Sequence, residues 1–318
     1  MNRILIAALL AFAYVVVPLA LGSNAYVVGL IVAALTIGGI AIAWALLGNL
    51  GGMVSFGHAA FFGIGAYVSA LLTLRAGWPV FPSMLVAGFG AAIASIATMP
   101  ALRLRGPYFA LAILAYAEIF RILATELKPI TGGAAGLLSI PRLPNVLGLD
   151  FGSKLGGYFV ILTIVVAAMV AYDLIRRSPY GLALKAMHDS EDATRVVGVN
   201  STMLKAWMLA VSAFITGMVG AFNAHYINFL EPDYAFAGQW TTLAIVSAIF
   251  GGYRTVSGPL LGALVVYLVD QLAFKPILPQ GHQIVLGVLL GAMILFSPGG
   301  LMPLLLSRLS RKEASHAA

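Results

Sequence analysis

The chain has 318 residues, of which 61% are hydrophobic and only 9% are charged, and its mean hydropathy is +1.00. This composition excludes a water-soluble globular protein and indicates an integral membrane protein. The formal net charge of +7 is also seen in nucleic-acid binders, but the basic residues lie in short loops between apolar runs, which membrane topology explains better. We therefore expect a lipid bilayer around the chain and no nucleic-acid partner.

The apolar runs predict an all-α fold, a polytopic transmembrane helix bundle of about ten spans that forms a single domain over residues 1–318. The runs are continuous, whereas an outer-membrane barrel would show short alternating segments. The first run could also be a signal peptide, although its length favours a retained span. The expected spans cover residues 4–21 and 26–47, a third ending near 74, a fourth ending near 102, 108–123, a sixth ending at 175, and 206–227, 240–250, 259–274 and 284–296.

The distribution of Lys and Arg sets the expected orientation. With ten spans and both termini on one side, twelve of the 18 basic residues fall on that side, five fall on the other and Arg121 lies within a span. Because basic loops stay in the cytoplasm, we expect both termini and the polar segment 176–205 to be cytoplasmic and the loop 126–157 to be external. The twelve are Arg3, Arg103, Arg105, Arg176, Arg177, Lys185, Arg195, Lys205, Arg254, Arg308, Arg311 and Lys312, and the five are Arg75, Lys128, Arg142, Lys154 and Lys275.

The segment 176–205 is the main polar island between the apolar runs. Ser178 followed by Pro179 is typical of a helix start, because serine caps a helix and proline suits its first position. Asp189 or Ser190 can cap a second short helix, which Gly198 would end. Two short helices on the membrane surface would form a binding surface for a partner protein.

Glu118 and Arg121 are charged residues inside an apolar run. They are three residues apart and therefore share one helix face. The rise of 1.5 Å per residue places Glu118 about 18 Å from the start of its span, near the middle of the membrane. The two residues could line a transport route or a subunit interface, or they could neutralise each other as a structural pair. Asp270, near the end of another span, is expected to be solvated.

His58 lies in a stretch rich in glycine. The stretch could be a broken helix along a substrate pathway, where freed backbone carbonyls face a wet cavity. The sequence favours the other interpretation, a packing surface of small residues around a histidine with a structural hydrogen bond. Glycines four residues apart, at positions 258 and 262 and at positions 287 and 291, also predict close helix packing.

The sequence contains none of the motifs that would indicate catalysis. There is no Gly-Lys dipeptide and therefore no phosphate-binding P-loop, and no Gly-x-Ser-x-Gly elbow for a nucleophile. There is no cysteine, and no His, Asp and Glu have the spacing of metal ligands. We therefore expect no catalytic residues, no metal and no cofactor in this chain, so that the energy for any work comes from a partner or an ion gradient.

Several stretches together carry a family resemblance. They are 57–67 (GHAAFFGIGAY), 102–110 (LRLRGPYFA), 131–133 (TGG) with Gly136 and Leu137, 178–181 (SPYG), 189–193 (DSEDA), Gly251 and Gly252 with Thr255, Gly258 with Pro259, and Gly262 with Ala263. From about residue 35 to residue 305 the chain resembles permease subunits of branched-chain amino acid ABC importers, specifically the LivM-type branch. The resemblance implies a multi-pass protein of the bacterial cytoplasmic (inner) membrane with the fold of an ABC importer permease.

The resemblance also implies roles for residues. The polar segment resembles the EAA-type loop, whose short helix docks in a groove of a cytoplasmic ATPase. The sequence Asp192-Ala193-Thr194 stands where that loop has Glu-Ala-Ala, and Leu182 and His188 replace basic residues that are common in the family. The residues so assigned to the ATPase-coupling loop are Ser178, Pro179, Tyr180, Gly181, Asp189, Glu191, Asp192, Ala193 and Gly198, and those assigned to the substrate pathway are His58, Phe62, Tyr108, Glu118 and Arg121.

The implied mechanism is alternating access, driven by ATP and Mg²⁺ on partner subunits. The implied partners are a homologous second permease, giving a heterodimer, two cytoplasmic ATP-binding subunits and a periplasmic or extracellular substrate-binding protein. The implied substrate is a branched-chain or related hydrophobic amino acid, with urea or short amides as an alternative. An ion-coupled secondary transporter with Glu118 as its ion site, and a membrane scaffold without transport, are the other interpretations.

Overall fold

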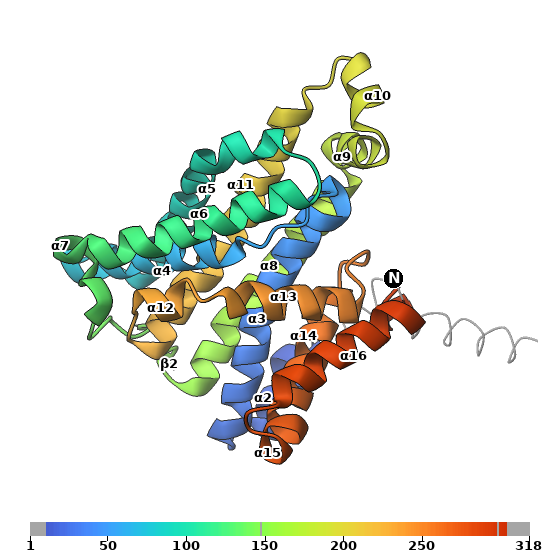
Figure 1. Cartoon of the computed structure of the whole chain (residues 1–318). Coiled ribbons are helices and arrows are strands. Elements are labelled where there is room, and N and C mark those ends of the chain that lie inside the picture. Colours follow the sequence, from blue (N-terminus) through green and yellow to red (C-terminus); the bar gives the residue numbers. More distant parts are fainter. Residues whose placement is uncertain (1–10, 147, 298, 304–318) are drawn as a thin grey trace, which may run out of the picture.

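The computed structural model describes residues 11–146, 148–297 and 299–303, and its long elements are all helices (Figure 1). In the described residues the one sheet is a hairpin of two-residue strands, β1 (Asn145–Val146) and β2 (Leu149–Asp150). The predicted all-helical membrane architecture is confirmed. Within these described ranges, seven helical segments are long and apolar enough to cross a membrane: α3 (Ala25–Gly51), α4 (His58–Arg75), α5 with η2 (Val80–Ala94 and Ser95–Arg103), α6 (Pro107–Glu126), α8 (Lys154–Arg177), α11 (Ser201–Ile227) and α14 to α15 (Gly258–Ile277).

The other three of the ten predicted spans correspond, in the described residues, to helices that are shorter than these seven. They are the segment of η1 and α2 (Phe12–Val16 and Val17–Leu21), α13 (Gly238–Gly251) and α16 (His282–Phe296). With 14 and 15 residues, α13 and α16 extend about 21–23 Å, less than the hydrocarbon core of about 30 Å. Residues 4–10 of the first predicted span lie outside the described residues.

Helix α3 is the centre of the bundle. It packs against α8, α11, α13 and α14, and all its residues from Ala34 to Leu47 are buried. A helix that is apolar on every side, as α3 is, can be surrounded completely by other helices. Its ends have clear causes, because the Asn24 side chain accepts hydrogen bonds from two backbone N–H groups of the first turn, and Gly52 takes the left-handed conformation that ends the helix.

Glycines bring two pairs of helices into backbone contact. A Cβ at Gly65 of α4 would lie 2.1 Å from the carbonyl oxygen of Gly217 on α11, and one at Gly262 of α14 would lie 1.9 Å from the carbonyl oxygen of Ser247 on α13. The predicted packing role of glycine is therefore confirmed at these positions. It is wrong for Gly287 and Gly291 on α16, where an added Cβ would meet no atom within 4 Å, because α16 lies on the outside of the bundle.

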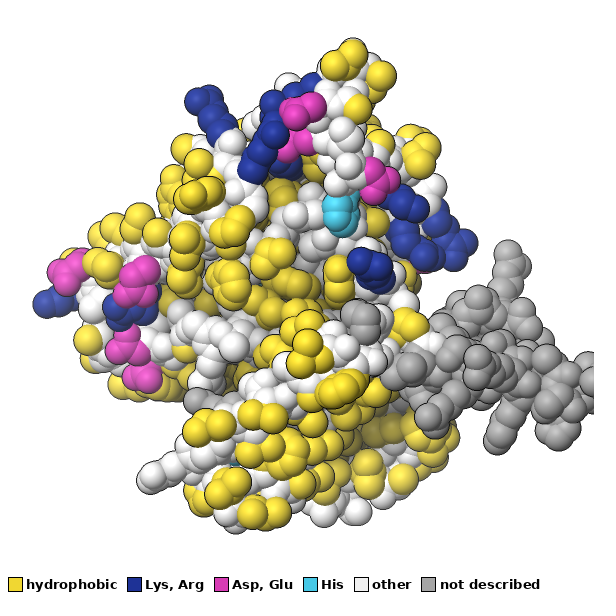
Figure 2. Space-filling view, turned by 45° about the vertical axis from the view of Figure 1, so that its right-hand side comes forward, with side chains coloured by type: hydrophobic (Ala, Val, Ile, Leu, Met, Phe, Trp, Pro, Cys, Tyr) yellow, Lys and Arg dark blue, Asp and Glu magenta, His cyan; other side chains and the backbone are white. Residues whose placement is uncertain are grey.

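The polar segment of the chain folds into two short helices, α9 (Pro179–Asp189) and α10 (Glu191–Val196), which project at the top of Figure 1. We call α9 and α10 the hairpin, and the end of the bundle where they lie the hairpin end. Asn49 donates to the carbonyl of Arg254 at this end, whereas Arg75 donates to the carbonyls of Pro129 and Ile130 at the opposite end. The loops therefore sort into two sets, and Figure 2 shows a largely hydrophobic surface with the charges gathered near the hairpin and at one edge.

The long connection after α6 lies at the opposite end. It contains α7 (Lys128–Thr131), the short turn η3 (Gly133–Ala135) and the paired strands β1 and β2. Leu137 pairs with Leu230 through backbone hydrogen bonds of 2.7 and 3.1 Å, which ties this connection to the chain after α11. The ring nitrogen Nδ1 of His225 lies 2.7 Å from the carbonyl oxygen of Pro141 and adds a second tie.

Candidate functional site

The hairpin is built by local capping. The Oγ of Ser178 accepts a hydrogen bond from the backbone N–H three residues later, at 3.2 Å, and Ser190 does the same for α10 at 3.4 Å. Pro179 occupies the first position of α9, and Gly198, with φ of +87°, follows α10. The two predicted short helices and their starts are thus confirmed, and Ser190 rather than Asp189 is the cap of α10.

A cluster of ion pairs holds the hairpin against the bundle. Glu191 contacts Lys205 of α11 at 2.8 Å, Arg195 at 2.7 Å and Arg105 at 3.6 Å. Arg105, in the loop before α6, also donates to Asp192 at 2.8 Å. The side chains of Glu191 and Lys205 are only 15% and 9% exposed. Glu191 therefore faces inward and connects the hairpin with α11 and α6, instead of facing a partner as the family resemblance implies.

The electrostatics of the cluster favour the charged forms. Burial opposes ionisation of Glu191, but the hydrogen bond and charge of Lys205 outweigh it and lower the pKa of the carboxyl group. The hydrogen bond from Arg105 lowers the pKa of Asp192, and the same contact raises the pKa of the Arg105 guanidinium. Glu191, Asp192 and Arg105 therefore stay ionised through the neutral range.

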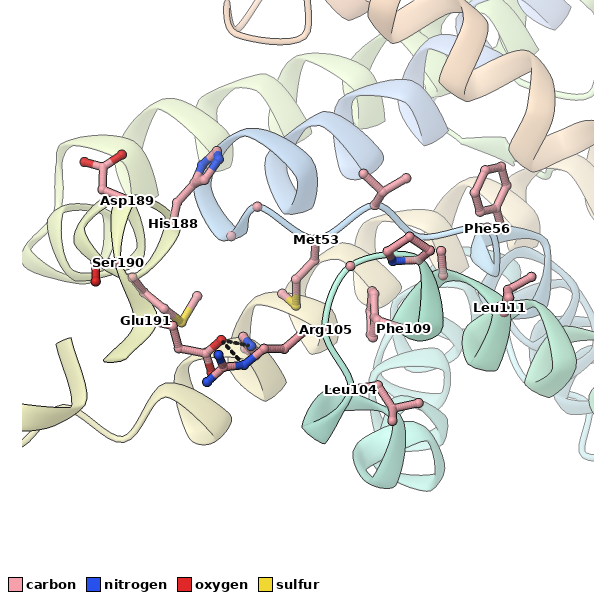
Figure 3. Close-up of a pocket in the computed structure, with 18 residues that line it drawn as sticks. Met53, Phe56, Leu104, Arg105, Phe109, Leu111, His188, Asp189, Ser190 and Glu191 are labelled. Atoms are coloured by element: carbon pink, nitrogen blue, oxygen red, sulfur yellow. Dashed lines mark hydrogen bonds and ion pairs between the residues drawn. The ribbon is translucent and has the colours of Figure 1, made fainter. Parts of the chain in front are cut away.

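A cavity of about 680 Å³ lies beneath the hairpin, between the end of α3, the loop that follows it and the start of α6. Figure 3 shows Glu191 and Arg105 meeting on one side of it and Met53, Phe56 and Phe109 lining the deeper part. The Nδ1 of His188 lies 3.2 Å from the carbonyl oxygen of Asn49 near the end of α3. The hairpin thus contacts α3, α6 and α11 around one cavity.

The outer face of the hairpin carries exposed apolar side chains. Leu182 is 72% exposed and Tyr180, Val196 and Val197 are exposed to a similar or greater extent. Asp189 is also exposed. Apolar side chains on a polar projection are typical of a protein–protein contact. This face is exposed, as is the Asp192 side chain, whereas Glu191 is largely buried.

The residues assigned to the substrate pathway do not meet in one cavity of this chain. His58 and Phe62 are fully buried. The Nε2 of His58 lies 2.8 Å from the Oγ of Ser212, and the Phe62 ring stacks on Trp240 with centroids 4.4 Å apart. In the described residues, His58 and Phe62 are packing residues at the contact of α4 with α11 and α13.

Glu118 and Arg121 lie on the surface of the bundle. Arg121 pairs with Glu118 and also with Asp233 of α12 (Pro232–Ala235) at 2.7 Å, and the Glu118 side chain is 56% exposed. The two residues therefore belong to a cluster of three that includes the connection after α11, and not to an isolated pair in mid-membrane. Tyr108, at the other end of α6, is also exposed and lies far along the helix from this cluster.

Comparison with known proteins now identifies the family. The family described as branched-chain amino acid transport system, permease component, matches residues 4–297. The chain belongs to this permease family. Its members are transport proteins and not enzymes, and this permease is accordingly a multi-pass membrane protein of an ABC transport system.

Individual relatives agree with this assignment. The permease is 30% identical to the high-affinity branched-chain amino acid transport system permease protein LivM of Escherichia coli (strain K12), over 84% of this chain and 68% of the relative. It is 26% identical to BraD of Pseudomonas aeruginosa and 22% identical to LivH of Escherichia coli (strain K12), in both cases over 83% of this chain and 90% of the relative. No solved structure matches the permease.

Sequence reasoning missed several residues of the permease that the fold brings together. Arg105 and Lys205 were assigned only to loops, because nothing local indicates that they meet Glu191 from positions 86 and 14 residues away. Asp270 was expected to be solvated, yet it is 5% exposed and contacts His282 of α16 at 2.9 Å. Little in the sequence indicated these contacts, since Arg105, Lys205 and Asp270 each stand beside an apolar run with no local partner pattern. Within the described residues, no group of three or more His, Asp and Glu could hold a metal ion.

Proposed function

We propose that this permease is one of two membrane subunits of an ATP-driven importer of leucine, isoleucine, valine or a related hydrophobic amino acid in a bacterial cytoplasmic membrane. Its partners in this proposal are a homologous second permease, two cytoplasmic ATPases and a substrate-binding protein on the outer side. The relatives LivM and LivH are permeases of a branched-chain amino acid transport system, which supports the substrate class. The similarity to both of these proteins of one organism supports a pair of homologous permeases.

The observation that carries the proposal is the projecting hairpin with its exposed apolar face. In our proposal, Leu182 and its neighbours enter a groove of the ATPase, and ATP-driven closure of the two ATPases moves the hairpin. Glu191 would pass this movement to α11 through Lys205 and to α6 through Arg105. The bundle then alternates between openings on its two sides, and a loaded binding protein biases it because it prefers one of the two states.

The proposed orientation places the hairpin end in the cytoplasm. Eight of the basic residues in the described part of the chain belong to the loops and helix ends on that side, against five at the opposite end. The excess supports a cytoplasmic hairpin by the positive-inside rule. Because the chain has no cysteine, the variants Val197→Cys and Leu149→Cys each carry a single thiol, and an impermeant maleimide applied to whole cells should label only the second.

Two matched leucines test the coupling role. Leu182 in the hairpin is 72% exposed and Leu138 at the opposite end is 67% exposed. We expect Leu182→Asp to abolish co-purification of the ATPases and amino acid uptake, and Leu138→Asp to leave the ATPases bound. Normal ATPase association and uptake in Leu182→Asp would disprove the coupling role.

The alternatives predict different results. Uptake by the reconstituted chain alone, without ATP and sensitive to an uncoupler, would favour an ion-coupled transporter. Competition of uptake by urea or acetamide but not by leucine would favour a permease for short amides. Unchanged uptake in cells after deletion of the gene would favour a scaffold.

A further inference from the structure

A second cavity, of about 850 Å³, lies toward the opposite end of the bundle and has no part in the coupling surface. It is enclosed by α3, the last turns of α11, α12, α13, the π-helical turn η4 (Asp270–Phe274) and α16. Its volume is in the range of small-molecule binding sites in proteins. It is therefore large enough to enclose an amino acid together with some water.

One wall of this cavity carries a carboxylate and an ammonium group. The backbone N–H of Lys275 donates to the carbonyl of Asp270, a bond that closes one π-helical turn. The exposed Lys275 side chain lines the same cavity, and its ammonium group also donates to the Oε1 of Gln271 at 3.4 Å. π-Helical turns inside α-helices are frequent at functional sites. His282 contacts the Oδ1 of Asp270, and no hydrogen bond from the described residues occupies its other oxygen. A 5% exposed carboxylate in a membrane bundle with a free oxygen is a binding-site feature.

Another part of the lining is aromatic and aliphatic. Trp240 and Leu243 of α13 and Leu286 of α16 line it, with Tyr234 of α12 beside them. The hydroxyl of Tyr226, in the same lining, is buried and has no hydrogen-bond partner in the described residues, so that the wall also holds an unused donor. The lining combines these apolar side chains with hydroxyl and amide groups of Tyr, Thr, Asn and Gln residues, so that it offers both polar and apolar contacts to a small amphipathic ligand.

We infer that this cavity binds a zwitterionic apolar α-amino acid within the single permease subunit. Asp270 receives the ammonium group, Lys275 receives the carboxylate, and the side chain of the ligand packs on Trp240 and Leu243. The inference rests on the proposed function and names the chemical class of its substrate. Urea has neither the charges nor the apolar part to use both walls, and is excluded by the same geometry.

The binding test uses the full chain in nanodiscs of phosphatidylglycerol, which contains no ammonium headgroup, with radiolabelled leucine as the probe. We expect saturable binding that Asp270→Asn weakens at least about thirtyfold, because an ammonium group loses its charged partner. Binding of 4-methylpentanoate, which has the leucine skeleton without the ammonium group, should not be weakened by Asp270→Asn, because this ligand has no positive charge that pairs with the Asp270 carboxylate. Equal leucine affinity in wild type and Asp270→Asn would overturn the inference.

Two glycines of α16 provide a second test that does not depend on the charges. Gly287 lines the cavity and Gly291 does not, and an added Cβ at either meets no atom within 4 Å. Gly287→Leu should fill part of the cavity and abolish leucine binding, whereas Gly291→Leu should bind as wild type. Equal binding by these two variants would overturn the site, whatever the result for Asp270.

The remaining outcomes separate this inference from its premises. Leucine binding that phosphatidylethanolamine in the nanodisc abolishes would assign the charged pair to a lipid headgroup and overturn the amino acid assignment. If leucine does not bind but the ATPases co-purify through the hairpin, the inference fails and the proposed function stands. If neither is observed, both fail.

Discussion

The ion-pair cluster predicts that Glu191 determines whether the hairpin stays attached. Glu191→Ala leaves Lys205, whose side chain is 9% exposed, without its carboxylate. At 2.8 Å and an effective dielectric constant of about 20, the attraction that is lost is about 6 kcal/mol before desolvation is counted. The net cost of leaving one partner of a buried pair alone is about 3–5 kcal/mol. Local detachment of the hairpin should therefore become about a hundredfold or more easier.

Thiol labelling can measure this detachment. Thr194 of α10 is 5% exposed and the natural chain has no cysteine, so Thr194→Cys provides a single buried thiol. In this background, maleimide labelling in nanodiscs should accelerate about a hundredfold with Glu191→Ala. Asp192→Ala is the matched control, because the Asp192 side chain is 75% exposed and such a pair contributes only about 0–1 kcal/mol.

A double variant separates charge from attachment. Glu191→Leu with Lys205→Met replaces the buried pair by apolar side chains of similar size, which is often neutral for stability. We expect this double variant to label nearly as slowly as the Thr194→Cys background. A labelling rate in Glu191→Ala within about twofold of the background, or equal to that of Asp192→Ala, would refute the assigned role of Glu191.

Three further predictions follow from packing and charge. Gly65→Ala should lower the free energy of unfolding by at least about 1–3 kcal/mol, since its Cβ would meet the backbone of Gly217 at 2.1 Å, while Gly29→Ala, with open space, should not; equal melting temperatures would contradict this. Glu118→Ala and Glu118→Gln should both reduce uptake by less than about twofold, because the half-buried Arg121 keeps Asp233 as a second carboxylate partner, and a large loss confined to the alanine variant would argue for a transport role. Asp192 has a folded pKa below its ordinary 3.8, so its contribution to hairpin attachment is present above that pH and is lost as the pH falls through the lower folded value. Because maleimide reacts with the thiolate, each labelling rate is divided by that of a free thiol at the same pH, and a ratio that changes between pH 8 and 5 would contradict this.

The hairpin shows which features the sequence could predict. Ser178 and Ser190 cap helices through contacts three residues away, so local chemistry predicted both helices. The role of Glu191 could not be predicted, because its pairing with Arg105 depends on how α6 is placed against the hairpin. The same limit applies to His58, whose partner Ser212 lies 154 residues away and is brought to it by the packing of α4 on α11.

The sequence also could not show whether the shorter apolar segments form helices long enough to cross the membrane. Residues 240–250 are apolar enough to predict a membrane span. The helix that contains them, α13, has only 14 residues, because it ends at Gly251 before Gly252 with its positive φ. The burial of Asp270 follows from the π-helical turn η4, which turns it toward α16. No pattern in the local sequence predicts the extra residue in the helical turn η4.

Helix α3 has a consequence for the biosynthesis of the protein. As the first of the long helices to emerge from the ribosome, it must enter the membrane before α8, α11, α13 and α14 exist to cover it. Acyl chains and leucine side chains are equally apolar, so a segment without a polar stripe can exchange one surrounding for the other at little cost. A charged residue in the middle of α3 would oppose its insertion into the bilayer during translation, and would then oppose its packing against the other helices.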